Sequence, residues 1–138
     1  MSNRRTSMTE NSRTREGPIR LLLADDEEGY VHVLANRLAK RNIDVTKTHS
    51  GQQAIQALRR EDFDVAVLDL KMEDMDGIEV LKILKKMDPR LEVIMLTGHG
   101  SEQAASDGLK CGAFDYLTKP CELEELLEKI HEAARQRG

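Results

Sequence analysis

The sequence predicts an α/β protein, built as a three-layer α/β/α sandwich around a five-stranded parallel sheet. Five short apolar runs alternate with five segments whose apolar residues recur every three or four positions. Strands covered on both faces have such unbroken apolar runs. Because helices separate them along the chain, the strands are expected to be parallel with right-handed crossovers. The 138 residues are enough for one such domain.

The first half of the chain alternates strand, helix, strand, helix. Residues 19–24 are almost entirely apolar and predict a buried strand, whereas residues 42–49 alternate weakly and predict a strand nearer the sheet edge. Ser50 is a favourable N-cap for the helix that follows. The apolar faces of the two helices are expected to be Val31, Leu34, Ala35 and Leu38, and then Ala54, Ile55, Ala57 and Leu58.

The second half continues the alternation. Residues 63–69 predict the central strand, and Asp76 can cap the next helix. Residues 91–97 and 113–118 predict two further strands, separated by a helix that opens at Ser101 and has few large apolar residues, so we expect it to be the least firmly packed. The apolar faces of the three helices are expected to be Ile78, Leu81 and Leu84; Ala104, Ala105 and Leu109; and Leu123, Leu126, Leu127, Ile130 and Ala134.

Residues 1–17 are predicted to form a flexible N-terminal tail, because their Ser, Thr, Asn and Arg side chains cannot bury enough apolar surface to order the backbone. Residues 18–138 then form the single domain. The last predicted helix runs to the end of the sequence, so we expect no output domain after it. Cys111 and Cys121 fit none of the usual metal spacings and are expected to be unpaired thiols in or near the core.

Charge and hydropathy argue against two classes of partner. The chain has a formal net charge of −4, and its basic tail leaves the remainder more acidic still. An acidic body gives no electrostatic footprint for nucleic acid, so we expect no direct nucleic-acid binding. No apolar run follows Arg4-Arg5 as an export signal requires, and none is long enough to span a membrane. We therefore expect no membrane partner and a cytoplasmic location.

Functional side chains stand at the ends of four predicted strands. Asp25 and Asp26 follow the first strand, Asp69 ends the central one, and Thr97 and Lys119 end the last two. The carboxyl ends of parallel strands meet at one edge, where ligands bind in open α/β sheets. Three neighbouring carboxylates repel one another unless they share a cation, and Mg²⁺ suits such a site. A carboxylate there can attack phosphorus, while an ammonium and a hydroxyl stabilise the phosphoryl group.

Taken together, these residues resemble the receiver domain of two-component response regulators. The resemblance covers about residues 18–135 and implies a flavodoxin-like strand order, 2-1-3-4-5, for a receiver domain over residues 18–138. Each motif is weak alone, but the set in order at successive strand ends is specific. The motifs are Asp25-Asp26; Asp69-Leu70-Lys71-Met72 with Met75-Asp76-Gly77; Thr97-Gly98; and Tyr116-Leu117-Thr118-Lys119-Pro120.

The resemblance implies a metal site and a phosphoacceptor. Asp69 would accept the phosphoryl group. Asp26, Asp69 and the backbone carbonyl of Lys71 would bind Mg²⁺ or Mn²⁺ directly, and Asp25 would act through a metal-bound water. The chain departs from the family at the two residues after Met72, where Glu73-Asp74 replaces the usual proline and frequent glycine. Loss of that proline predicts a less rigid loop.

The resemblance also implies a phosphoryl-binding group and a switch. Thr97, Gly98 and Lys119 would bind the phosphoryl group, and Thr97 and Tyr116 would change position on activation. The peptide bond between Lys119 and Pro120 is usually cis in this family.

The function so predicted is a signalling switch of a phosphorelay and not an enzyme. Asp69 would take a phosphoryl group from a sensor histidine kinase or a phosphotransfer protein. The surface formed by the fourth helix, fifth strand and fifth helix would then change its affinity for an unidentified downstream protein, or form a phosphorylation-dependent homodimer. At most, slow self-phosphorylation and self-dephosphorylation are expected.

Three alternatives remain at this point. The first is a phosphatase or phosphotransferase that works through an aspartyl phosphate. Such enzymes usually place a second Asp two residues after the nucleophile as a general acid, and Lys71 occupies that position here. The second is a binding module that has lost phosphorylation, although every matched residue is present. The third is a flavin-binding protein, which lacks the aromatic loop residues that would stack on the ring.

Overall fold

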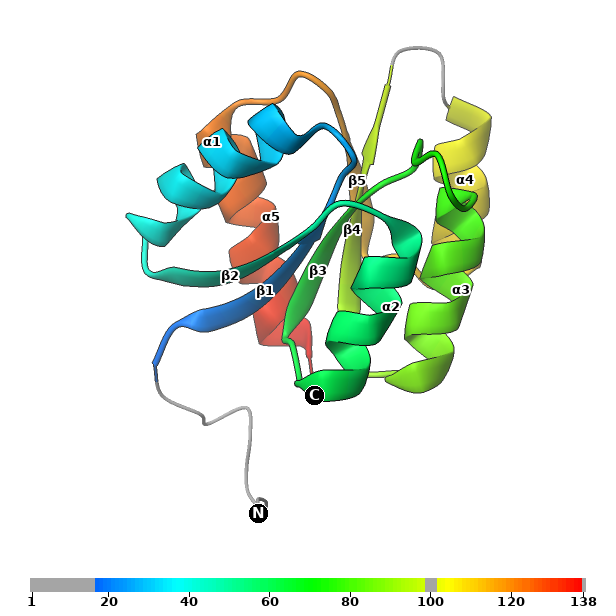
Figure 1. Ribbon diagram of the computed structural model, residues 1–138, viewed down its shortest axis with the longest axis horizontal. Coiled ribbons are helices and arrows are strands. Elements are labelled where there is room, and N and C mark those ends of the chain that lie inside the picture. The colour runs from blue at the N-terminus through cyan, green and yellow to red at the C-terminus, as the bar shows by residue number, and fades with distance from the viewer. Residues whose placement is uncertain (1–16, 99–101, 138) are drawn as a thin grey trace.

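Five strands alternate with five helices in the part of the chain that the computed structural model describes, residues 17–98 and 102–137 (Figure 1). The strands are β1 (Ile19–Ala24), β2 (Ile43–Thr48), β3 (Val65–Asp69), β4 (Glu92–Thr97) and β5 (Asp115–Thr118). The helices are α1 (Glu28–Ala39), α2 (Gly51–Arg60), α3 (Gly77–Met87), α4 (Glu102–Lys110) and α5 (Leu123–Gln136). Apart from Gly17, the predicted tail lies outside the described residues, as does the helix start expected at Ser101.

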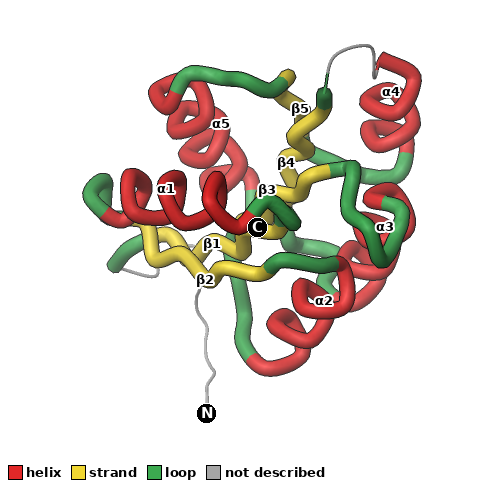
Figure 2. The backbone as a smooth tube through the Cα atoms, turned by 45° about the horizontal axis from the view of Figure 1, so that its top comes forward, coloured by secondary structure: helices red, strands yellow, loops and turns green. Residues whose placement is uncertain are grey.

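The strands form one parallel sheet in the order β2-β1-β3-β4-β5. The predicted fold class and strand order are therefore confirmed. In Figure 2, α1 and α5 lie on one side of the sheet and α2, α3 and α4 on the other. Because all strands run the same way and their registers align Asp69 with Leu96 and Thr97 with Thr118, the polar strand ends meet at one edge.

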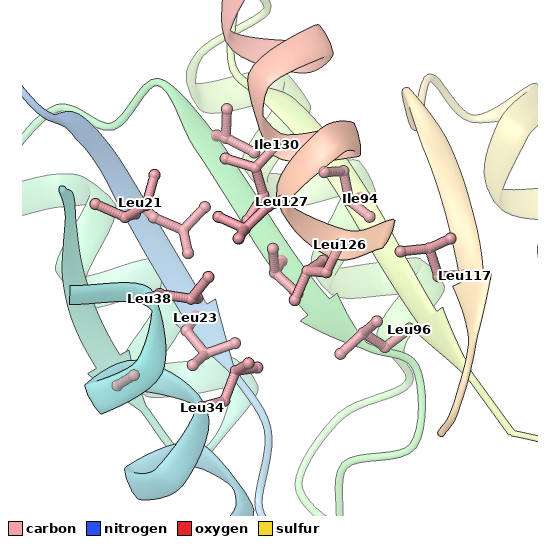
Figure 3. Packing of buried hydrophobic residues seen from close by; sticks show 14 of the residues in the cluster. Leu21, Leu23, Leu34, Leu38, Ile94, Leu96, Leu117, Leu126, Leu127 and Ile130 are labelled. Carbon is pink, nitrogen blue, oxygen red and sulfur yellow. The ribbon is translucent and has the colours of Figure 1, made fainter. Parts of the chain in front are cut away.

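Alternating strand side chains build two separate cores. Leu21 and Leu23 of β1 pack under α1 and α5, and Leu22 packs on the opposite face under α2 and α3. Figure 3 shows the first core, where Leu127 and Ile130 of α5 lie over the sheet. Both faces of the central strands are covered, which explains why their sequences are apolar without alternation. Cys111 and Cys121 are free and half-buried, in agreement with the prediction.

Two predicted helix caps are confirmed. The Ser50 hydroxyl accepts a hydrogen bond from the backbone N–H of Gln53 at 3.0 Å, and the Asp76 carboxylate accepts one from Ile78 at 2.9 Å. Both side chains satisfy N–H groups that have no partner inside their own helix.

The buried face expected for α4 is partly wrong. Ala105 is buried as expected, but Ala104 is only half-buried and Leu109 is 41% exposed, and the second buried residue of the helix is Gly108. A Cβ at Gly108 would lie 2.1 Å from the sulfur of Met95. The Met95 side chain of β4 therefore occupies the space that a side chain at position 108 would need, and α4 packs closely on β4 at this glycine. Large apolar residues do not indicate the buried face here, because the contact between α4 and β4 requires a residue without a side chain, Gly108. None of the described helices is long and apolar enough to cross a membrane.

Candidate functional site

Three carboxylates meet at the carboxyl edge of the sheet. One carboxylate oxygen from each of Asp25, Asp26 and Asp69 lies within 4.8 Å of the other two. Asp25 is fully buried and Asp69 is 6% exposed, so two of the three charges are taken out of water. Carboxylate oxygens grouped in this way fit a small hard cation such as Mg²⁺ or Mn²⁺, whose charge would offset their repulsion.

Each carboxylate accepts a hydrogen bond from a backbone N–H group. Asp25 accepts from the N–H of Glu27 at 2.9 Å, and Asp69 accepts from the N–H of Lys71 at 3.3 Å. Asp26 accepts from the N–H of Glu73 at 3.2 Å, which joins the loop after β1 to the loop after β3. The site therefore depends on the relative placement of two loops as well as on the strands.

Lys119 places its ammonium among the acids. Its Nζ lies 2.8 Å from a carboxylate oxygen of Asp25 and 3.8 Å from one of Asp69. Burial opposes its charge, but the hydrogen bond and charge of Asp25, reinforced by Asp69, raise the pKa of Lys119 above its usual value. The backbone N–H of Lys119 donates to the carbonyl of Thr97 at 2.7 Å, and the Lys119–Pro120 peptide bond is cis. This backbone bond ties the lysine segment to the end of β4.

The remaining matched residues lie around the cluster in different environments. Thr97 is buried, and its hydroxyl donates to the carbonyl of Leu117 in β5 at 3.4 Å, a long hydrogen bond. Gly98 is half-buried, and a Cβ there would meet no atom within 4 Å. Lys71 is exposed, and Tyr116 is 37% exposed. The structure thus places Asp25, Asp26, Asp69 and Lys119 together, with Thr97 tied to Lys119 through the backbone, while the Tyr116 ring is open to solvent.

The ionisation of Asp69 is costly in the absence of a cation. Burial, followed by the charge of Asp25, raises the pKa of Asp69 from its usual 3.8 to about 6, and Lys119 only partly opposes this shift. Because the pKa of Asp69 is raised in the folded state, protonation of Asp69 favours folding. Its contribution to the free energy of unfolding is fully present below about pH 4 and is lost as pH rises through about 6.

We therefore expect Asp69→Asn to stabilise the metal-free protein. At pH 8 the gain in the free energy of unfolding is expected to be about 1–3 kcal/mol, because the variant removes a charge that the folded site disfavours. The gain should shrink toward pH 4 and should fall when Mg²⁺ is added to both proteins. Urea unfolding followed by far-UV circular dichroism, with chelator or with Mg²⁺, measures it. An equal gain at both pH values would contradict this account.

Asp74 anchors the loop after β3. Its two carboxylate oxygens accept hydrogen bonds from the N–H groups of Gly51 and Gln52, at 2.9 and 3.0 Å, at the start of α2. These backbone bonds lower the pKa of Asp74. A loop expected to be less rigid without proline is thus tied to a neighbouring helix by a side-chain cap.

Asp74→Ala is expected to destabilise the protein by about 1 kcal/mol, because the first turn of α2 loses acceptors for two N–H groups. Because the pKa of Asp74 is lowered in the folded state, the difference from wild type should disappear as pH falls below its ordinary value of 3.8. Glu73→Ala removes the neighbouring exposed carboxylate and keeps both bonds, so its stability should stay within about 0.5 kcal/mol of wild type. Thermal unfolding between pH 3 and pH 8 tests both variants.

Two further residues of this site, Glu27 and Tyr30, were not predicted from the sequence. A Glu27 oxygen lies 3.2 Å from the Lys119 ammonium, and the centroid of the Tyr30 ring lies 4.7 Å from it. The only available signal was their spacing: the N-cap of α1 and a position three residues later fall on one face of a helix that starts beside the acids. That spacing gives no reason to connect them with a lysine near the other end of the chain.

A parallel doubly wound sheet with three carboxylates and a lysine at its carboxyl edge defines a class of domain that can hold a cation and a phosphoryl group. Residues 21–131 match the profile of the response regulator receiver domain, so the chain belongs to this family of two-component signal transduction domains.

Relatives and solved structures agree with this assignment. The chain is 36% identical over 119 residues to the transcriptional regulatory protein GlrR of Escherichia coli, covering 86% of this chain and 27% of that protein. It is 38% identical over 118 residues to the transcriptional regulatory protein YkoG of Bacillus subtilis, covering 86% of this chain and 52% of that protein. The chain thus spans about a quarter to a half of these curated relatives.

Two solved receiver domains show the same fold. The Francisella response regulator 1452 receiver domain superposes with a TM-score of 0.80 at 32% identity, over 87% of this chain and 99% of that one. A CheY-like receiver domain protein from Methanospirillum hungatei gives a TM-score of 0.83 at 29% identity, over 87% of this chain and 96% of that one.

Proposed function

We propose that this chain is the phosphoacceptor switch of a two-component phosphorelay, with residues 18–138 as its receiver unit and Asp69 as the residue that takes the phosphoryl group. The observation that carries the proposal is the position of the Asp69 carboxylate, nearly buried, within reach of two further acids and 3.8 Å from the Lys119 ammonium. The donor would be a sensor histidine kinase or a phosphotransfer protein acting in the cytoplasm, since receiver domains generally take phosphate from phosphohistidine.

The transfer step follows from this geometry. A carboxylate oxygen of Asp69 attacks the phosphorus of the phosphohistidine, the new O–P bond forms as the P–N bond breaks, and the electron pair stays on the departing imidazole, which takes up a proton. Lys119 lies close enough to neutralise an oxygen of the transferring group. Asp26, Asp69 and the carbonyl of Lys71 would hold Mg²⁺ or Mn²⁺, with Asp25 acting through a metal-bound water. The cation supplies electrostatic stabilisation of the phosphoryl oxygens.

The switch would begin at Thr97. Its hydroxyl is held by one long hydrogen bond, 3.4 Å, to the carbonyl of Leu117, and a phosphoryl oxygen on Asp69 offers a charged acceptor that binds more strongly. Movement of Thr97 toward that oxygen, with Gly98 beside it, would open space for Tyr116, whose exposed ring could then turn inward. The surface of α4, β5 and α5 would change, and with it the affinity for a downstream protein or for a second copy of the chain.

A small acyl phosphate tests the function without a kinase. With Mg²⁺ and acetyl phosphate, the intact protein should gain the mass of one phosphoryl group, and chelation of the metal should prevent the gain. Continuous release of phosphate over many turnovers would instead support the alternative of an aspartyl-phosphate phosphatase or phosphotransferase. That alternative is disfavoured because such enzymes usually have an Asp as general acid two residues after the nucleophile, and this chain has Lys71 there. If no mass is gained under any of these conditions, the proposed function is wrong.

A further inference from the structure

Two residues at the start of α1 contact the Lys119 ammonium: its N-cap, Glu27, and Tyr30 in its first turn. The Tyr30 ring centroid lies 4.7 Å from Nζ, and a carboxylate oxygen of Glu27 lies 3.2 Å from it. Together with Asp25 at 2.8 Å, these groups hold the lysine head in place, while Asp69 at 3.8 Å is beyond hydrogen-bonding distance. In this structure Lys119 is therefore positioned more by Asp25 and α1 than by Asp69.

The groups that contact the Lys119 ammonium differ in their exposure to solvent. The Glu27 side chain is 66% exposed, whereas the Asp25 side chain is fully buried. If only the two carboxylates acted, Glu27 and water would draw the ammonium outward, where a charge is better solvated. The Lys119 ammonium lies over the electron-rich face of the Tyr30 ring, and the Lys119 side chain is only 19% exposed, so the cation–π attraction is only partly screened by water.

The ring is itself fixed. Tyr30 is half-buried and packs against the core cluster under α1 and α5, so its position depends on a helix and a packed core, not on a loop. A group held in this way can fix the position of a partner without losing much freedom of its own.

We propose that Tyr30 is a positioning residue for phosphoryl transfer, whose ring face holds the Lys119 ammonium beside Asp25 and Asp69 so that it is in place when the phosphoryl group arrives. This inference rests on the proposed function. Tyr30 lies in α1, which contains none of the matched motifs. The inference requires an aromatic ring at position 30.

The test compares side chains at position 30 by the rate of phosphorylation. The second-order rate constant for labelling by acetyl phosphate is measured with saturating Mg²⁺. Tyr30→Leu keeps an apolar side chain but removes the ring, and we expect the rate constant to fall about three- to tenfold. Tyr30→Phe keeps the ring and should restore most of the rate. A rate for Tyr30→Leu equal to or above that of wild type overturns the proposal.

A fluorinated ring separates positioning from packing. Trifluorophenylalanine at position 30 keeps the shape of phenylalanine but withdraws electron density from the ring face, which weakens cation–π attraction. We expect its rate constant to fall below that of Tyr30→Phe and toward that of Tyr30→Leu, with an unfolding temperature close to that of Tyr30→Phe. If the two aromatic variants react equally fast, Tyr30 acts through packing alone and the proposal is wrong.

The same experiment distinguishes this inference from the function on which it rests. If the wild-type protein gains no phosphoryl group, both fail. If the wild type is labelled but the rate constant is the same across the series at position 30, only the role of Tyr30 fails and Asp69 remains the proposed phosphoacceptor.

Discussion

Asp69→Asn is expected to reduce labelling by acetyl phosphate and Mg²⁺ by more than about a thousandfold, to the background measured without acetyl phosphate. The amide keeps the shape of the carboxylate but has no anionic oxygen to attack phosphorus, and it removes one of the three acids that would share the cation. Mass spectrometry of the intact protein after timed incubation measures the effect. Asp69→Ala should behave in the same way.

Two controls make this result specific. Glu73→Gln changes an exposed carboxylate in the same loop and should be labelled at the wild-type rate, because the backbone N–H and not the side chain of Glu73 contacts Asp26. The second control is far-UV circular dichroism of Asp69→Asn in the same Mg²⁺ buffer, where a spectrum equal to that of wild type excludes unfolding as the cause of a loss. Labelling of Asp69→Asn at the wild-type rate would mean that another residue accepts the phosphoryl group.

Gly77→Ala is expected to destabilise the protein by at least about 3 kcal/mol. A Cβ at this position would lie 2.5 Å from the Cα and 2.6 Å from the carbonyl oxygen of Leu70, and backbone atoms cannot move aside as the end of a flexible side chain can. Gly77 also donates its N–H to the Leu70 carbonyl at 3.2 Å, which closes the loop after β3. The substitution should force this loop open and displace Lys71, so Mg²⁺ affinity should fall as well.

Gly29→Ala provides the matched control for Gly77→Ala. Gly29 lies in α1, and a Cβ there would meet nothing within 4 Å. The same chemical change should therefore leave stability unchanged or raise it by up to about 0.5 kcal/mol, since Gly29 lies in the first turn, where only part of the helix-interior difference between glycine and alanine applies. Because the chain has no tryptophan, urea unfolding is best followed by far-UV circular dichroism. If Gly77→Ala is as stable as Gly29→Ala, the loop closes in a different way from that described here.

Local pattern was enough to predict the architecture. The apolar runs and helical spacings predicted all ten elements, and the caps at Ser50 and Asp76 were predicted from residue type alone. These features could be predicted because each depends on a few neighbouring residues. The meeting of Asp25, Asp26 and Asp69 could also be predicted, since parallel strands bring their carboxyl ends to one edge regardless of packing detail.

Contacts between distant segments could not be predicted in this way. The absence of proline beside Asp74 predicted a less rigid loop, but the Asp74 carboxylate binds the start of α2, 23 positions away. Leu109 looked like part of a buried face, but the close contact of α4 with β4 occurs at Gly108. In both cases the outcome depends on which surfaces meet after folding, and spacing within one segment carries no information about that.

The strands, the helices, their parallel arrangement and the group of acids at the sheet edge could all be predicted from the amino-acid order, because hydrophobic period and strand direction are properties of the chain. The groups that neutralise and surround these acids could be identified only in the folded protein. Folding placed Lys119 2.8 Å from Asp25, 94 positions away, and brought the Tyr30 ring against that ammonium. The physical reason is that electrostatic and cation–π energies change over a few ångströms, and distances on that scale are fixed by packing between elements far apart in the chain.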